Sequence, residues 1–347
     1  MPATMLAAYR ATGADPPWGD PCRYHGVGME GYFWRITQPR DGVVVVVLVA
    51  VSRDAAGGTW GMLALATHPG GFVRSATVAD ARADRGRLGL RLAGDDGRAV
   101  LEASAERLRV DLGADATVDV GFAERAPWPP RWAFGGIGPA QAIPGLSQYW
   151  HPHLLGARVH GSATAGERTL ALDGATAYAE KNWGAGGHPP VWWWGQAHGF
   201  PGREDACVAF AGGAARLGPV ALPRATSIVV AIGGDVLRFV SPPVPLRVAV
   251  GADGWRLRAR TARHRVDIEG HAGGTEPHRL PVPVPADRRR RDGLSAMHLA
   301  ATLEVRLRRG RRVVFAGSSA LAGLERGLGP LSEDPEPAAG AGRPAAG

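Results

Sequence analysis

Short runs in which apolar and polar side chains alternate recur along most of the chain. A period of two is the pattern of a strand with one buried and one wet face. Glycine- and aspartate-rich turn signals such as Gly57-Gly58 and Gly233-Gly234 separate the runs. We predict strands over residues 43–51, 87–92, 106–112, 206–211, 226–232, 246–250, 255–260, 265–271 and 299–307.

Helical periodicity is nearly absent, and the pattern allows only one helical turn, near residues 319–326. The arginine-rich runs on either side of Gly310 predict a hairpin. Many short strands at this spacing are typical of sandwiches and up-and-down barrels. The sequence therefore predicts an all-β fold.

The length of 347 residues suits two halves of about 150 residues each. A proline- and glycine-rich stretch, residues 126–145, is the best candidate for a linker between them. The end of the chain is rich in proline, alanine and glycine, which predicts disorder. We therefore expect an N-terminal extension (1–20), a first β domain (21–135), a second β domain (136–330) and a disordered tail (331–347).

Composition and charge exclude several classes of protein. The net charge is +8, but most of the basic residues are scattered along the chain. The run Arg288–Arg291 fits a solvated loop, so we expect no nucleic-acid partner. Two cysteines exclude a disulfide framework. The longest apolar run, 43–51, is too short for a membrane span, and the first residues lack a secretory pattern. We expect a cytoplasmic protein, and peripheral membrane contact stays open.

The chain contains one lysine, Lys181, and one asparagine, Asn182, side by side. Both need codons that begin with two adenines, which GC-rich genomes tend to lose. Their survival at adjacent positions indicates that this place requires a compact ammonium group and an amide. The alternative is a polar turn after a strand.

The segment 23–36 places Glu30, Tyr32 and Trp34 on one face if it is extended. A carboxylate is costly to bury as an anion among aromatic rings, so such a group tends to stay protonated and can serve as an acid. Alternatively, Glu30 pairs with an arginine such as Arg35 and fixes the strand.

In segment 177–184, the same alternation puts Tyr178, Glu180 and Asn182 on one face and Lys181 on the other. Glu180 and Lys181 are therefore not expected to pair with each other.

In segment 189–200 one face carries tryptophans together with polar side chains. Such aromatics often form ordinary core, but polar groups beside them suit a ligand pocket. The residues on this face are Trp192, Trp194, Gln196, His198 and Phe200.

His151 and His153 could share a strand face as metal ligands. No cysteine or carboxylate cluster accompanies them in the sequence, so we expect no metal site.

Several of these segments resemble, in order, the conserved elements of the tocopherol cyclase family. The combination of EKNWG with a following W-x-W-x-Q is specific. The resemblance implies two tandem lipocalin-like β-barrel halves that both supply a site. It also implies closure of a prenylated quinol to a chromanol without a redox cofactor. The matching segments are MEGYFWR (29–35), YWHPHLLGARVHG (149–161), AYAEKNWGAG (177–186), PPVWWWGQAHGF (189–200) and VVFAGSSALAGLERG (313–327).

Two departures from the family pattern are visible. Gly187-His188, with one extra residue, replaces a Phe-Pro-like turn, and His198 stands where the family tends to have asparagine.

Chromanol closure requires protonation of a trisubstituted alkene, a tertiary carbocation and attack by a phenol oxygen. A neutral carboxylic acid is a natural proton source, and tryptophan faces stabilise a desolvated cation. We expect Glu180 to be the acid, with Glu30 as the other candidate. The candidate catalytic residues are Glu180, Glu30, Tyr178, Lys181 and His198, and the candidate substrate contacts are Tyr32, Trp34, Asn182, Trp183, Trp192, Trp194 and Gln196.

Two other functions stay open at this point. One is a different cation reaction on the same scaffold, such as isoprenoid hydration or another cyclisation. The other is a non-catalytic lipocalin-like binder of a quinone or isoprenoid lipid.

Overall fold

The computed structural model describes residues 3–185, 188–189, 191–285 and 293–330. It is nearly all β, with 61% of residues in strands and 4% helical, so the predicted fold class is confirmed. The described helices are α1 (Ala3–Arg10) and the short η1 (Gly138–Ala142). Neither of them has the length and apolar character needed to span a bilayer.

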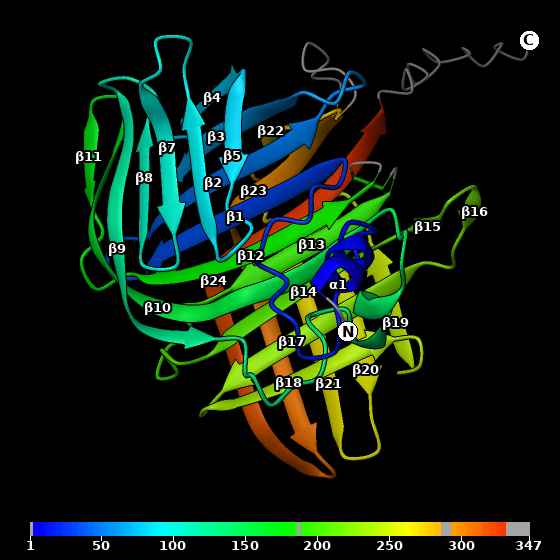
Figure 1. Cartoon of the computed structure of the whole chain (residues 1–347). Helices are drawn as coiled ribbons and strands as arrows, with labels where there is room; N and C mark the ends of the chain where they lie inside the picture. Colours follow the sequence, from blue (N-terminus) through cyan, green and yellow to red (C-terminus); the bar gives the residue numbers. More distant parts are fainter. Residues whose placement is uncertain (1–2, 186–187, 190, 286–292, 331–347) are drawn as a thin grey trace, which may run out of the picture.

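The first sheet is antiparallel throughout and curls into a nearly closed barrel (Figure 1). Its order is β4-β3-β2-β1-β12-β10-β9-β8-β7-β6-β5, with β11 on β10. The edge strands β4 and β5 are consecutive in the chain. The strands are β1 (Met29–Gln38), β2 (Val43–Arg53), β3 (Thr59–His68), β4 (Val73–Val78), β5 (Asp80–Ala83), β6 (Gly89–Ala93), β7 (Ala99–Ser104), β8 (Arg107–Asp111), β9 (Ala116–Pro127), β10 (Tyr149–Ala165), β11 (Arg168–Ala171) and β12 (Thr176–Gly184).

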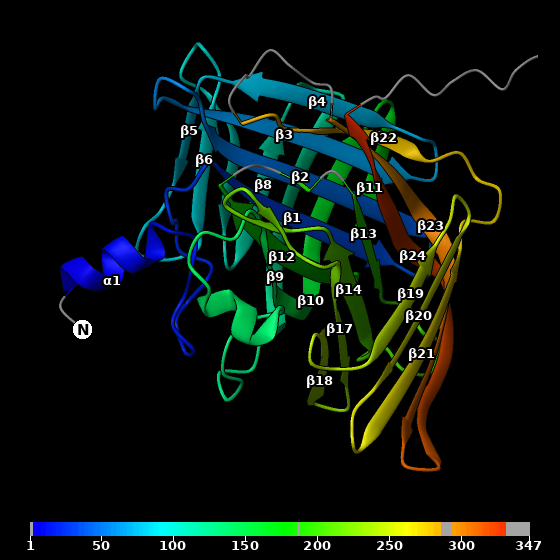
Figure 2. The same cartoon turned by 90° about the vertical axis from the view of Figure 1, so that its right-hand side faces the viewer.

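The second sheet has the order β18-β17-β14-β13-β24-β23-β21-β20-β19, with β22 on β23, and it also curls into a barrel. Its long strands β23 and β24 extend beside the first barrel (Figure 2). A small hairpin, β15–β16, stands apart. The strands are β13 (Trp192–Ala197), β14 (Cys207–Gly213), β15 (Arg216–Leu217), β16 (Val220–Ala221), β17 (Ala225–Ile232), β18 (Asp235–Ser241), β19 (Leu246–Val250), β20 (Gly254–Arg260), β21 (His264–His271), β22 (His278–Val282), β23 (Gly293–Arg309) and β24 (Arg312–Pro330).

The predicted position of the boundary between the halves is wrong. Strands β10 to β12 pair with β9 and β1, so the first sheet continues to Gly184 and the second begins at Trp192. Residues 128–148 form a long connection between β9 and β10 within the first sheet. Proline and glycine mark an irregular segment, but they do not reveal which strands pair on either side of it.

The region around residues 319–326 also differs from the prediction, because it is part of strand β24 rather than a helical turn. The hairpin around Gly310 is confirmed. The predicted loop at Arg288–Arg291 and the predicted disordered tail lie outside the described residues.

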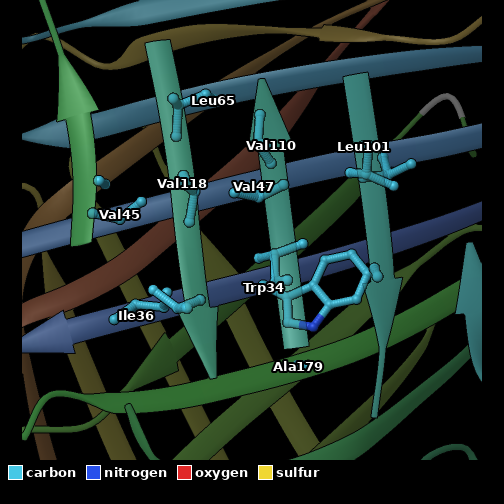
Figure 3. Close-up of a cluster of buried hydrophobic side chains, with 14 of the residues drawn as sticks. Trp34, Ile36, Val45, Val47, Leu65, Leu101, Val110, Val118 and Ala179 are labelled. Atoms are coloured by element: carbon cyan, nitrogen blue, oxygen red, sulfur yellow. The ribbon is translucent and has the colours of Figure 1, made fainter. Parts of the chain in front are cut away.

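Inside the first barrel, aliphatic and aromatic side chains from opposite walls fill the space. Trp34 and Ile36 from β1 meet Val110 from β8 and Val118 from β9 (Figure 3). The outer face of β1, β2 and β12 is buried as well, because it packs against β13, β14 and β17 of the second barrel. This two-sided burial explains why residues 43–51 read as an unbroken apolar run rather than an alternating one.

Arg35 links the two barrels at this interface by hydrogen bonds. It is fully buried, and its Nη2 atom donates to the carbonyl oxygens of Leu299 (2.8 Å) and Leu321 (2.5 Å) in β23 and β24. Its Nη1 atom donates to Thr37 (2.7 Å) and to the side chain of Gln196 in β13 (3.2 Å). Burial lowers the pKa of Arg35 to about 9, so it stays charged at neutral pH.

Candidate active site

A cavity of about 630 Å³ lies between the two barrels and takes its walls from both. Most of its lining is apolar or aromatic, with a few polar groups, as is usual for small-molecule sites. From the first barrel it receives Phe33, Leu48, Trp150, Glu180 and Asn182, and from the second Trp192, Trp194, Ser295, Met297 and Glu325.

Strand pairing explains why these side chains converge. Phe33 pairs with Glu180 and Gly31 with Asn182 across the antiparallel strands β1 and β12. Directly opposed residues share a face, and this one is turned toward the second barrel. A Cβ atom at Gly31 would lie 2.2 Å from the Asn182 Oδ1 atom, so the glycine makes room for the amide.

Glu180 is a buried carboxyl group, 4% exposed, on the wall of this cavity. Its Oε2 atom accepts hydrogen bonds from the Tyr178 hydroxyl (2.5 Å) and the Trp194 indole N–H (2.8 Å). Burial raises the pKa of Glu180 to about 7, although these two donors act in the opposite direction. Glu180 therefore keeps its proton to a higher pH than an ordinary glutamate does.

Asn182 also lies on the cavity wall. Its side-chain oxygen is buried and has no hydrogen-bond partner within the described part of the chain. A buried acceptor of this kind is costly when nothing donates to it, so the hydrogen bonding of Asn182 is incomplete in this structure.

Glu325 is a second carboxyl group in the cavity, and the sequence analysis did not single it out. Burial and the nearby charge of Glu180 raise its pKa to about 7. The only sequence signal was the A-x-x-E pattern that ends at Glu325, in a segment quoted for the family resemblance. No role could be assigned from it because the strand's partners were unknown.

Glu30 differs from the expected neutral acid. Burial alone would raise its pKa, but the charge of Lys181 and the contacts with His25 outweigh burial and lower the pKa to about 2. The Lys181 Nζ atom lies 2.6 Å from Glu30 Oε2, inside the first barrel and away from the cavity. The alternative interpretation, a structural ion pair, is the correct one, although the partner is Lys181 rather than Arg35.

Backbone carbonyl groups and aromatic rings also hold Lys181 in place. Its ammonium group donates to the carbonyl oxygens of Pro21 (3.1 Å) and Arg23 (2.9 Å) and lies over the rings of Tyr32 and Trp183. The predicted commitment of Lys181 to fixed contacts is confirmed. It faces away from Glu180, as the alternation predicted, and it is not in the cavity lining.

The ion pair continues into the N-terminal segment. The His25 Nδ1 atom lies 3.1 Å from Lys181 Nζ, and the His25 Nε2 atom lies 2.9 Å from Asp15 Oδ2. Asp15 in turn pairs with Arg10 at 2.6 Å. These contacts fix the N-terminal segment against the first barrel.

Three predicted substrate contacts lie elsewhere. Tyr32 and Trp34 belong to the core of the first barrel, and Trp34 also borders a separate cavity of about 470 Å³. Trp183 stacks between His25 and Tyr149 and donates to the carbonyl oxygen of Gly13 (2.7 Å). Of the predicted contacts, Trp192, Trp194 and Asn182 do line the cavity between the barrels.

The prediction that Gln196 and His198 line the cavity with Trp194 is also wrong. Gln196 accepts a hydrogen bond from Arg35 in the tight interface between the barrels. His198 donates from Nε2 to the carbonyl oxygen of Leu155 (2.9 Å), and burial lowers its pKa to about 4. Side-chain alternation predicts which residues share a face, but it does not predict which of them line the cavity and which pack tightly against the other barrel.

A metal site was not expected at His151 and His153. Within residues 3–330, as far as the structure describes them, no group of three or more histidine, cysteine or acidic side chains could hold a metal ion.

The two nearly closed barrels place the protein in the lipocalin-like class of β folds. Residues 130–328 match the family described as Tocopherol cyclase-like. Because this match covers more than half of the chain, the chain belongs to the tocopherol cyclase-like family. The matched range contains both Glu180 and Glu325.

Two known proteins are similar to this chain. The chloroplastic tocopherol cyclase of Zea mays is 30% identical over 129 residues, which are 35% of this chain and 27% of that protein. The match thus spans about a quarter of the relative's length. The crystal structure of kievitone hydratase from Nectria haematococca aligns over 87% of this chain and 89% of its own, with 13% identity and a TM-score of 0.50. At this identity the likeness shows the fold alone.

The Lys181–Glu30 pair can be tested by denaturation. Lys181→Met leaves a buried carboxylate without its partner, so the free energy of unfolding should fall by about 3–5 kcal/mol in urea titrations. The double variant Glu30→Gln/Lys181→Met removes both charges and should recover part of this loss. Lys181→Arg should also lose stability, because a planar guanidinium group cannot fill the place of the ammonium. Wild-type stability of Lys181→Arg would contradict the inference from the rarity of lysine.

Proposed function

We propose that this protein is a cofactor-independent cyclase that protonates an isoprenoid double bond of a prenylated quinol and closes the ring to a chromanol. The observation that carries the proposal is the buried acid Glu180, with its pKa raised to about 7, on the wall of an aromatic cavity. Membership of the tocopherol cyclase-like family supports it.

The proton donor in this reaction is Glu180. Its Oε2 atom accepts both the Tyr178 and the Trp194 hydrogen bonds, so the other oxygen is free to carry the proton. Once the proton has moved to the alkene carbon, the same two donors stabilise the carboxylate that remains. Hydrogen bonds to an ionised group are roughly twice as strong as neutral ones, so this support increases as the transfer proceeds.

The cation that follows protonation is stabilised by the cavity walls. Phe33, Trp150, Trp192 and Trp194 present aromatic rings, and a desolvated cation over such a ring gains about 2 kcal/mol. The lining contains no lysine or arginine among the residues that the structure describes. An apolar wall also limits the water that would convert the cation to an alcohol.

The quinol oxygen is oriented by the side-chain amide of Asn182, which lies on the cavity wall. Ring closure forms one C–H and one C–O bond and breaks one O–H bond and one π bond. The substrate and the product are isomers, so the proposed reaction needs no redox cofactor.

Activity is tested with a panel of prenylated quinols, with detection of products of unchanged mass on a chiral column. Glu180→Gln keeps the shape of the side chain but removes its transferable proton, so turnover should fall about 10²–10⁴-fold while ligand binding persists. The double variant Glu30→Gln/Lys181→Met, which removes a buried carboxyl group outside the cavity together with its charged partner, is the control. A product heavier by one water would indicate a hydratase, and tight binding without turnover by the wild type would indicate a carrier.

The hydrogen bond from Tyr178 can be tested by a pH profile. Tyr178→Phe removes a donor that favours the ionised form, so the pKa of Glu180 should rise. The acid must be protonated to react, so the loss of kcat/KM at alkaline pH should move to higher pH. Tyr32→Phe, which removes a hydroxyl beside Glu30, is the control and should leave the profile in place. An unchanged profile in Tyr178→Phe would argue against Glu180 as the acid.

We further propose peripheral contact with an anionic membrane at the side of the cavity where exposed apolar side chains gather. Ile143 lines the cavity, and Leu217 and Val220 project from the β15–β16 hairpin, which a bridge between Leu146 and Leu217 joins to the cavity wall. The exposed Arg216, in the same hairpin, complements an anionic surface.

Co-sedimentation with vesicles that contain anionic lipid tests this contact. Leu217→Ser/Val220→Ser should weaken the binding, since it removes the apolar tip of the hairpin. Val313→Ser/Val314→Ser changes two exposed apolar residues of the β23–β24 hairpin and should not. Equal binding by both variants and the wild type would contradict the proposed surface.

A further inference from the structure

We infer that Glu325 is the base that accepts the proton of the attacking hydroxyl group, so that it and Glu180 form a pair that passes one proton in each catalytic cycle. This inference rests on the proposed function. It extends that function to a residue of the second barrel.

The strand register places Glu325 on the cavity face. Trp194 of β13 and Glu325 of β24 are directly opposed across an antiparallel ladder, so their side chains share a face. The indole N–H of Trp194 is bonded to Glu180 of the first barrel. Trp194 is therefore bonded to one carboxyl group and shares a strand face with the other, and the two carboxyl groups line the same cavity from opposite barrels.

Among the groups around Glu325 that the structure describes, Glu180 is the charged one that acts on it. The hydroxyl of Ser295 in β23 and the indole N–H of Trp192 in β13 lie beside Glu325, and neither side chain carries a charge. The other titratable groups in the lining are His188, whose pKa burial lowers to about 4, and Tyr149, whose pKa burial raises to about 12. Both of these are neutral near pH 7.

Two carboxyl groups in one apolar cavity cannot both ionise easily. The charge of Glu180 raises the pKa of Glu325, and by linkage the charge of Glu325 must raise the pKa of Glu180. The pair therefore retains a proton to a higher pH than an isolated glutamate would. The negative charge of its ionised member also compensates the positive charge that develops on the substrate.

With this pair, the enzyme gives up one proton and takes up one proton in each cycle. Glu180 gives its proton to the alkene carbon, and the resulting cation is attacked by the hydroxyl oxygen. The C–O bond forms as the O–H proton moves to the carboxylate of Glu325. The enzyme then holds its proton on Glu325, and transfer back to Glu180 through water, as the product leaves, restores the starting state.

The pH dependence of kcat/KM distinguishes this role from a structural one. The reactive form has Glu180 protonated and Glu325 ionised, so the wild-type profile should be bell-shaped. Glu325→Gln cannot accept the proton. Its rate should fall on the order of 10²-fold, and its profile should lose the acidic limb. Glu325→Asp keeps a carboxyl group and should recover that limb in part.

Two outcomes separate this inference from the proposed function. A normal rate for Glu180→Gln overturns the assignment of the acid, whatever Glu325 does. The inference on Glu325 is overturned if Glu180→Gln is inactive while Glu325→Gln keeps both the wild-type rate and the acidic limb.

A spectroscopic titration tests the pair even if Glu325→Gln fails to fold. The infrared carbonyl band of protonated carboxyl groups should persist to near pH 7 in the wild type. In Glu180→Gln the repulsion is gone, so the remaining carboxyl band should disappear at a lower pH than in the wild type. A band from Glu325 that titrates at the same pH in both proteins would contradict the coupling.

Discussion

The burial of both faces of β1, β2 and β12 is the constraint on which the rest of the structure depends. Their inner face fills the first barrel, and their outer face has to be covered by the second. Arg35 makes this contact specific, because its buried guanidinium group satisfies carbonyl groups in β23 and β24. The cavity is the part of this shared interface that side chains do not fill, so it cannot form in either barrel alone.

The same strands also give two glutamates opposite chemistry. Glu30, on the inner face, has Lys181 beside it and is held as an anion, whereas Glu180, on the outer face, has only neutral donors, and burial raises its pKa to about 7. The neighbours across the strands, rather than the residue type, determine which glutamate anchors the barrel and which can act as an acid. Lys181 and Glu180 are adjacent in the chain yet serve these two separate environments.

Local periodicity was sufficient to predict nine of the strands and the faces of 177–184, because side-chain alternation depends only on an extended backbone, but it missed others such as β3, β7 and β9. It was insufficient wherever the position or the protonation state of a residue depends on a strand far away in the sequence. The boundary at 135/136 failed because β12 inserts between β1 and β10. The protonation state of Glu30 depends on its ion pair with Lys181, which lies on another strand. The position of Glu325 in the cavity became visible only with its strand register opposite Trp194.

The long separation in sequence between the cavity's components has a consequence for the synthesis of the protein. The outer faces of β1 and β2 are made well before the strands that cover them, including β23 and β24. Contacts of such high sequence separation form slowly, and an uncovered apolar sheet face promotes aggregation. A chain shortened before β23 and β24 is therefore expected to be an aggregation-prone barrel rather than a smaller functional protein.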